Sequence, residues 1–171
     1  MTAAPITWWQ DDEQRLLAEC VALAAAAPDL RWEPKGPGYW RGAVPLWPFD
    51  RPQPEGLPAL VGGRPLEVAV LCRPPHPMVP PIVVPYSVTP PTRALGYASW
   101  HLLPSGALCL VRGTAWWDPQ RLIASLVPKI SGWYIEFQLM MAGLLDEMPA
   151  RGVDRDDGLD ALIDRAREPA R

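Results

Sequence analysis

The sequence of 171 residues contains no asparagine, only two histidines and only three cysteines. Because the cysteines are odd in number and far apart, a disulfide framework is excluded, and so is a metal site of closely spaced cysteine pairs. Only His76 and His101 could join the cysteines in a structural zinc site, so we expect no metal, and nothing in the sequence points to a cofactor. The candidate thiol nucleophiles are Cys20, Cys72 and Cys109.

Positive charge and long apolar runs are also scarce. A formal net charge of −3 lacks the basic excess of a nucleic-acid-binding protein, so we expect no nucleic-acid partner. No stretch approaches the roughly 18 consecutive apolar residues of a membrane-spanning helix, so we expect no membrane partner either. The first 14 residues are acidic and do not resemble a signal peptide, which predicts a cytoplasmic location.

The composition that remains is that of one globular domain, with 49% hydrophobic and 20% charged residues. Its 23 prolines are scattered through apolar segments and predict long, shaped loops, including one over 50–65. Hydrophobic periodicity and turn residues predict the following elements. In chain order they are a helix over 11–27, two strands within 30–47, a strand over 66–73, a short strand over 81–85, a helix over 118–128 and a helix over 132–148.

This order of elements predicts an α+β fold with antiparallel strands and argues against a doubly wound parallel sheet. Cys20 falls on the apolar face of the first helix, and Cys72 shares the apolar face of the strand over 66–73 with Leu66, Val68 and Val70. Both thiols are therefore expected in the core. Cys109 differs, because it lies in the long segment 86–114, which has no sustained periodicity and is of the length that functional loops have.

Two segments of the chain contain motifs with informative spacing. The first, LEVAVLCRPPHPMVPPIVV at residues 66–84, resembles the part of ubiquitin-conjugating enzymes in which a strand leads into tyrosine-proline, two variable residues and proline-proline. Here His76 replaces the tyrosine, while Pro77, Pro80 and Pro81 keep the spacing. The second segment, HLLPSGALCLVRGTAWWDP, resembles the active-site segment, and its matching positions are His101, Gly106, Cys109, Leu110, Trp117 and Pro119.

The resemblance covers about residues 10–148 and leaves 149–171 as a charged helix or tail. It implies the ubiquitin-conjugating fold: an N-terminal helix, an antiparallel sheet of about four strands, a long active-site loop and C-terminal helices. It also implies an activity, in which Cys109 accepts a ubiquitin-like modifier as a thioester from an adenylating activating enzyme. The modifier then passes to a lysine of a target protein.

The sequence departs from the family where the histidine is usually followed by proline and asparagine, since HLL stands here instead. The family's asparagine is proposed to order the loop or to stabilise the oxyanion that forms when a lysine attacks the thioester. Here a backbone N–H, Ser105 or Gln120 must take this role, or no group does. In lacking the asparagine the chain resembles divergent bacterial relatives, which occur with an activating enzyme, a modifier and a deconjugating protease, often in antiviral defence.

Several roles stay open at this point. His101 can hydrogen-bond within the loop or act as a base. Asp118, together with Pro119, can begin a helix or orient the incoming lysine. Arg112 can favour the thiolate of Cys109, which burial would oppose. Trp8 and Trp9 can be exposed for docking to an activating enzyme or pack into the domain.

Two other functions compete with this interpretation. The chain can be a catalytically silent member of the same fold that acts as an interaction module, although silent members commonly lose the cysteine that is present here. It can also be a cysteine hydrolase that uses Cys109 and His101. The residue types that such an enzyme needs are present, but the sequence contains no motif that places them in a characteristic order.

Overall fold

A four-stranded antiparallel sheet forms the centre of the structure. The computed structural model describes residues 6–110 and 116–166. Strands β1 (Arg31–Glu33), β2 (Tyr39–Ala43), β3 (Glu67–Leu71) and β4 (Ile82–Pro85) follow one another in this order across the sheet. The predicted α+β class and all the predicted strands are therefore confirmed.

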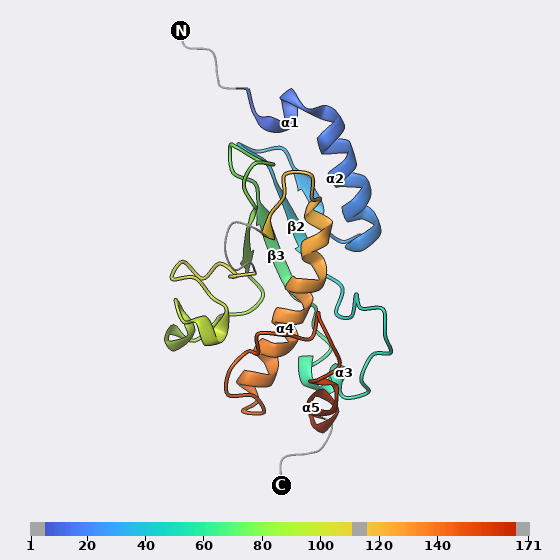
Figure 1. Cartoon of the computed structure of the whole chain (residues 1–171), viewed down its shortest axis with the longest axis vertical. Helices are drawn as coiled ribbons and strands as arrows, with labels where there is room; N and C mark the ends of the chain where they lie inside the picture. Colours follow the sequence, from blue (N-terminus) through green and yellow to red (C-terminus); the bar gives the residue numbers. More distant parts are fainter. Residues whose placement is uncertain (1–5, 111–115, 167–171) are drawn as a thin grey trace.

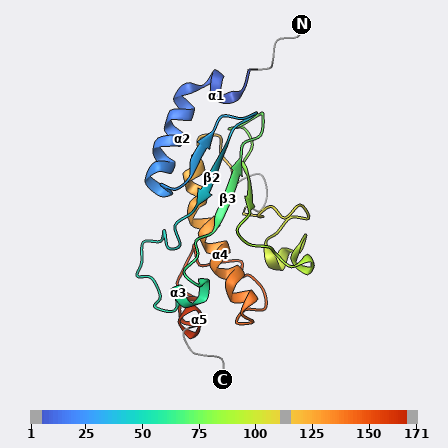
Figure 2. The same cartoon turned by 180° about the vertical axis from the view of Figure 1, so that it is seen from behind.

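The helices lie mainly on one side of this sheet and at its two ends. They are α1 (Trp8–Asp11), α2 (Glu13–Ala26), α3 (Leu57–Val61), α4 (Val127–Met141), α5 (Asp160–Arg165) and the short 3-10 helices η1 (Thr92–Ala94), η2 (Ala98–Trp100) and η4 (Ile123–Leu126). α4 lies in front of the strands in Figure 1 and behind them when the molecule is turned around in Figure 2. One face of the sheet therefore packs on α4, and no helix of the described residues covers the other face.

The core lies between the sheet and α4. Trp40, Val70 and Val83 are paired across three adjacent strands, and all are almost fully buried. Alternation along β3 buries Val68 and Val70, which confirms the predicted apolar face of this strand. α4 supplies the opposite layer, because every residue from 130 to 137 is buried.

The predicted helix over 11–27 is confirmed as α2, and the Asp12 carboxylate caps it by accepting a 2.8 Å hydrogen bond from the Arg15 N–H. Its buried face differs from the apolar pattern. Leu17 is exposed, whereas Glu19 is completely buried. A carboxylate therefore occupies part of the helix's core-facing side.

The short helix α1 brings Trp8 and Trp9 back onto the domain. The Trp8 Nε1–H donates to the carbonyl of Pro37 at 2.6 Å, and the Trp9 Nε1–H donates to that of Gly36 at 3.1 Å. The Trp8 side chain is buried. The alternative that these residues form an exposed aromatic surface is wrong for Trp8, which packs into the domain.

The prediction of a helix over 118–128, stopped by Pro128, is wrong. Residues 118–121 form a turn, η4 follows, and Pro128 lies in the first turn of α4. At that position the missing N–H of proline has no intrahelical partner to lose. The predicted helix over 132–148 is confirmed in part: it begins earlier, at Val127, and ends at Met141.

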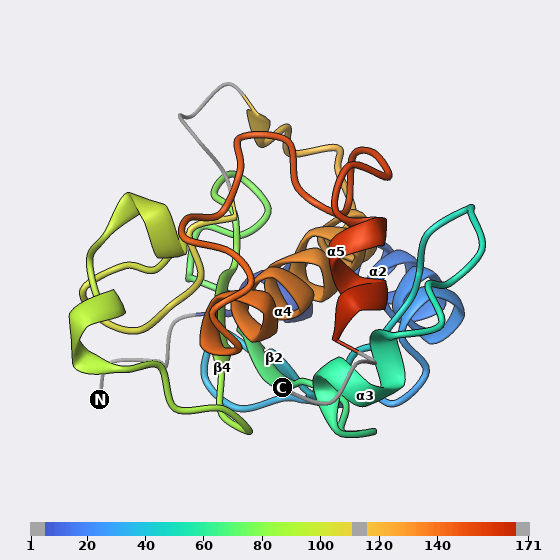
Figure 3. The ribbon, with the colours of Figure 1, turned by 90° about the horizontal axis from the view of Figure 1, so that it is seen from below.

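At the far end of the molecule, α3 and α5 lie side by side (Figure 3). α3 begins within residues 50–65, which we predicted as a loop, so that prediction is wrong for this helix. α5 lies in the segment 149–171, predicted as a charged helix or tail, and its Ile163 is completely buried. The division of the chain at residue 148 stays a prediction.

The segment from residue 86 to 110 contains η1, η2 and an isolated antiparallel bridge between Leu102 and Leu108. It extends away from the sheet to one side of the molecule (Figure 3). Among the helices of the described residues, none is both long and apolar enough to cross a membrane.

Candidate functional site

The backbone holds Cys109 in place on two sides. The Leu108 N–H donates to the carbonyl of Val83 in β4 at 2.8 Å, which fastens the loop to the edge of the sheet. The next N–H, that of Cys109, donates to the carbonyl of His101, also at 2.8 Å. Between His101 and Cys109 the chain turns at Gly106, whose φ of 82° favours glycine. The resemblance therefore named three residues that the structure joins in one tight loop.

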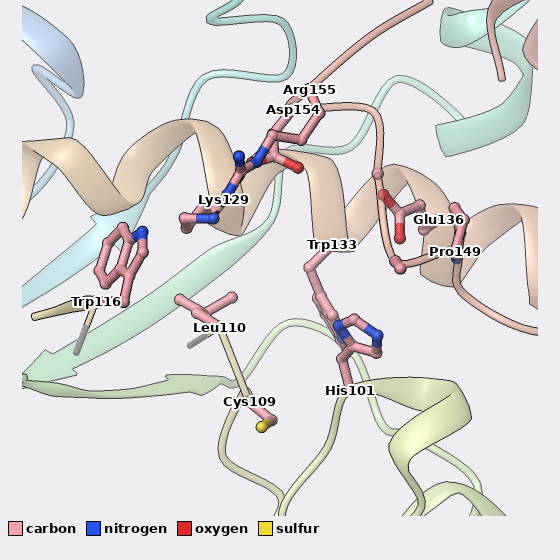
Figure 4. A pocket seen from close by; sticks show the side chains of 12 residues that line it. His101, Cys109, Leu110, Trp116, Lys129, Trp133, Glu136, Pro149, Asp154 and Arg155 are labelled. Atoms are coloured by element: carbon pink, nitrogen blue, oxygen red, sulfur yellow. Dashed lines mark hydrogen bonds and ion pairs between the residues drawn. The ribbon is translucent and has the colours of Figure 1, made fainter. Parts of the chain in front are cut away.

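Cys109 and His101 both line a pocket of about 220 Å³, which we call the Cys109 pocket. Figure 4 shows the two residues on the loop side and Lys129, Trp133 and Glu136 on α4 across from them. The spacing of these three α4 residues places them on one helix face. A third wall comes from the segment after α4, where Pro149, Ala150, Gly152, Asp154 and Arg155 line the pocket.

Charges of both signs surround this pocket. The Lys129 ammonium lies 3.5 Å from the Asp154 carboxylate and 5.0 Å from the ring centre of Trp116. Arg155 lies 3.7 Å from the same carboxylate. Asp154 therefore has a cation on each side, and the pair with Lys129 ties the first turn of α4 to the segment that follows the helix.

Glu136 is the most unusual ionisable group of the pocket. Its side chain is buried, and one carboxylate oxygen accepts a 2.9 Å hydrogen bond from the Val153 N–H. Gly152 packs directly against this carboxyl, and a side chain there would collide with it. Burial raises the pKa of Glu136 to about 7, and the nearby Asp154 acts in the same direction against the opposing effect of the Val153 N–H.

A second cavity opens on the other side of Cys109. This groove of about 280 Å³, which we call the proline groove, is mostly apolar and includes Pro80, Pro81, Ile82, Leu103, Leu108 and Leu126. Arg73 also lines it, and the Arg73 guanidinium donates to the carbonyl of Pro80 at 3.3 Å. Cys109 thus lies between a polar pocket and an apolar groove.

The segment from Pro77 to Pro81, which we call the proline shelf, contacts Trp117 at its first residue. The Trp117 Nε1–H donates to the carbonyl of Pro77 at 2.8 Å. His76 is buried beside Trp8, with ring centres 4.5 Å apart, and lies 6.4 Å from the ring of Trp117. His76 and Trp117 are therefore packing residues, and the contact joins two segments that the resemblance had identified separately.

Glu19 connects this shelf with the helices. Its carboxylate accepts a 2.9 Å hydrogen bond from the Arg15 guanidinium and a 2.8 Å hydrogen bond from the Ile123 N–H at the start of η4. His76 Nε2 lies 3.6 Å from the same carboxylate. Arg15 also donates to the carbonyls of Pro119 and Arg121. These contacts fix residues 119–123, which follow the loop that contains Cys109.

Asp118 and Pro119 therefore act differently from the prediction that they begin a helix. The Asp118 carboxylate accepts a 2.8 Å hydrogen bond from the Gln120 N–H and closes a turn. Asp118 is exposed, and neither it nor Pro119 is among the residues that line the Cys109 pocket. The lysine-orienting role for Asp118 has no support from this geometry.

The other two cysteines are shielded to different degrees. Cys72 is buried, and burial raises the pKa of its thiol to about 12, with a further contribution from Glu19. Cys20 is partly buried against the core, and burial again raises its pKa. Cys109 is the one cysteine that lines both the pocket and the groove.

Ser105 and Gln120, predicted as replacements for the absent asparagine, line neither cavity. The Ser105 hydroxyl instead accepts a 3.4 Å hydrogen bond from the Ala107 N–H within the loop. Arg112, predicted to favour the thiolate, lies outside the described residues. Within 6–110 and 116–166, no group of three or more His, Cys, Asp and Glu residues is placed to hold a metal ion.

The sequence analysis missed the four charged residues of the pocket: Lys129, Glu136, Asp154 and Arg155. The sequence carried a usable signal for Lys129 and Glu136, which share a helix face with Trp133 in an otherwise apolar helix. Charged residues on such a helix are almost never fully buried unless they are paired, so their presence indicates a polar site. Asp154 carried no such signal.

Comparisons of the chain with models of protein families, with curated proteins and with solved structures find no match.

Proposed function

We propose that the protein is a carrier transferase of the ubiquitin-conjugating fold. Cys109 takes the C-terminal carboxyl group of a ubiquitin-like modifier as a thioester from an adenylating activating enzyme and passes it to a lysine of a target protein. The single observation that carries the proposal is the position of Cys109, partly exposed between the Cys109 pocket and the proline groove. Acyl transfer between two proteins needs two such approaches to one thiol, one for the acyl chain and one for the acceptor.

The groove suits the acyl chain and the pocket suits the acceptor. An extended peptide tail without charged side chains can lie along the apolar proline groove, with its terminal carbonyl carbon at Cys109 Sγ. An amine is a cation until it reacts, and the Cys109 pocket contains the Glu136 carboxyl group, whereas Asp154 is already paired with Lys129 and Arg155. The difference between an apolar groove and a charged pocket therefore supports a direction of transfer.

The two chemical steps exchange bonds of similar kind. In the first, the Cys109 thiolate attacks the incoming thioester, forms a new sulfur–carbon bond and releases the thiolate of the activating enzyme. In the second, an amine nitrogen that has lost a proton attacks the same carbon. An amide forms, the nitrogen loses a second proton, and the Cys109 thiolate leaves.

The order of the elements also supports the proposal. An N-terminal helix, a four-stranded antiparallel sheet, a loop bearing the cysteine and C-terminal helices follow one another as the resemblance implies. Anchoring on both sides of the loop keeps the nucleophile in a fixed place, as transfer chemistry requires. A bacterial antiviral defence system is the setting that we propose with this function.

The first experiment tests whether Cys109 accepts an acyl group. A fluorescent peptide ending in two glycines, supplied as the thioester of a small thiol, is incubated with the full chain. We expect an adduct that a reducing thiol removes and that maps to Cys109. In Cys109→Ser this thiol-labile adduct should disappear, while Cys20→Ser and Cys72→Ser, as matched controls, should retain it.

The alternatives give other results in the same assay. If the protein is a silent interaction module, the folded chain forms the adduct no faster than the chain unfolded in denaturant does. A hydrolase forms the adduct but releases the free peptide acid faster than it transfers the peptide to added lysine. A thiol-labile adduct that maps to Cys72 or Cys20 would place the nucleophile elsewhere and overturn the proposal.

A further inference from the structure

The chain contains only two lysines, Lys35 and Lys129, and one of them lines the pocket that contains Cys109. Lys35 is exposed in the turn between β1 and β2, away from both cavities. Lys129 lines the Cys109 pocket from the first turn of α4 (Figure 4). An amine of the same chain is thus placed where an acceptor amine would enter.

The Lys129 ammonium is held loosely. Its distance of 3.5 Å to Asp154 exceeds the 2.7–3.2 Å that is usual for an N–H···O hydrogen bond. Its other contact, over the ring of Trp116 at 5.0 Å, is not directional in the way a hydrogen bond is. Because a lysine has a flexible four-carbon stem, the nitrogen can leave both contacts without movement of the helix.

We infer that Lys129 is an acyl acceptor within the chain: a group carried on Cys109 passes to Lys129 Nζ and remains on α4 as an amide. This inference rests on the proposed function. The Sγ–carbonyl bond of Cys109 breaks, a carbonyl–Nζ bond forms, the ammonium loses two protons, and Cys109 returns to its thiolate. No oxidant, metal or further reactant takes part.

The pocket also contains a titratable carboxyl group. Glu136 lies on the same face of α4 as Lys129, about two helical turns away, so a proton from Lys129 Nζ can reach it only through solvent in the pocket. Its pKa of about 7 suits proton transfer near neutral pH, whereas an ordinary exposed carboxylate is a weaker base. In Figure 4 the sulfur of Cys109 points to the loop side, so the transfer requires rotation of this side chain, which is fast compared with chemistry.

Transfer inside one chain has a functional consequence. A tethered amine has a high effective concentration at the thioester, so it competes with a target lysine whenever no target is bound. The protein would then modify itself at one defined position. The product would occupy the Cys109 pocket and block it, which would make charging without a target self-limiting.

The test follows the peptide thioester described above, now over time. We expect the thiol-labile adduct of the full chain to convert to a thiol-resistant adduct that maps to Lys129. Conversion should be first-order and independent of protein concentration. In Lys129→Arg, which keeps the cation beside Asp154 and Trp116, the labile adduct should form as before and the conversion should fall at least tenfold. The matched control Lys35→Arg should behave as the unsubstituted chain.

A second measurement does not depend on thioester formation. A reagent that alkylates a thiol at one end and acylates an amine at the other, with a short spacer, should link Cys109 to Lys129 within one chain. The absence of this link, a labile adduct that never converts, or unchanged conversion in Lys129→Arg would each overturn the inference and leave the proposed function standing. The absence of any labile adduct would overturn the proposed function, and the inference with it.

Discussion

At the scale of single residues, Glu136 is a buried carboxyl group that also lines the Cys109 pocket. Its carboxyl group is shielded by α4 and by the segment around Gly152, and it shares the pocket with Cys109 and His101. Burial disfavours the charged form, so the folded state binds a proton more tightly than the unfolded chain. Stability must therefore depend on pH through this group.

We predict that stability decreases between about pH 4.5 and pH 7 because of Glu136. The pKa is about 7 in the folded state and 4.5 as the ordinary value, so the folded state holds the extra proton in this window. The contribution is fully present below pH 4.5 and is lost as the pH rises through 7, with a total on the order of 1–3 kcal/mol. Urea unfolding at several pH values measures it.

The control for this prediction is Glu136→Gln. The amide oxygen can still accept from the Val153 N–H, and the side chain no longer titrates. The stability difference between Glu136→Gln and the original chain should therefore grow in favour of the variant from pH 4.5 to pH 7. Parallel curves across this range would show that Glu136 has an ordinary pKa in the folded protein.

The sequence predicted some site residues better than others. Cys109, His101, Gly106 and the prolines stand at spacings that a motif records, and the structure brings them around one loop. Glu136 was not predictable in this way, since its raised pKa depends on a segment that returns to α4 after residue 149. Nothing near it in the sequence indicates which chain segment will cover it.

At the scale of elements, the largest error of prediction concerned residues 118–128. Local rules favour a helix that begins at Asp118 and Pro119, because aspartate caps helices and proline is tolerated in a first turn. The structure instead makes a turn and a 3-10 helix, whose Ile123 N–H is bound by the Glu19 carboxylate. The decisive partner lies about a hundred residues away in α2, where no local pattern can show it.

We predict that Glu19→Ala strongly destabilises the fold. It leaves the partly buried Arg15 guanidinium and the Ile123 N–H without this carboxylate. Removing one partner of a fully buried ion pair costs about 3–5 kcal/mol, and Arg15 keeps the carbonyls of Pro119 and Arg121, so we expect the lower end of this range. Glu19→Gln keeps an oxygen for the Ile123 N–H and should cost less. Gln14→Ala, exposed on the same helix, is the matched control and should change the free energy of unfolding by less than about 0.5 kcal/mol. Equal effects of Glu19→Ala and Gln14→Ala in urea unfolding would contradict this assignment.

At the scale of the whole molecule, the Cys109 pocket is assembled from three distant parts of the chain. The loop at residues 101–110, one face of α4 and the segment 149–155 each contribute a wall. The sequence predicted the first two as a loop and a helix, and it placed the third within a charged helix or tail over 149–171. Arg51 contacts both this segment, at Val153, and α5, at Asp160.

Arg51 holds this wall from outside the pocket. Its guanidinium donates to both oxygens of Asp160, at 3.0 and 3.1 Å, and to the carbonyl of Val153 at 2.9 Å. It also stacks over the rings of Trp47 and Phe49. Because its side chain is about one-fifth exposed, solvent weakens these interactions compared with a fully buried pair.

We therefore predict that Arg51→Ala loosens the segment from Val153 to α5 while the sheet stays folded. The free energy of unfolding should fall by about 1–3 kcal/mol, and a protease should cut between residues 149 and 160 before it cuts elsewhere. Arg51→Lys keeps the charge but cannot bind both oxygens of Asp160 in the same geometry. Its cleavage rate should therefore lie between those of the original chain and of Arg51→Ala. Arg64→Ala, an exposed arginine after α3, should be cut as slowly as the original chain. If Arg51→Ala were equally resistant, the Glu136 bond to Val153 and the burial of Ile163 would be enough to hold the wall, and Arg51 would have no part in shaping the Cys109 pocket.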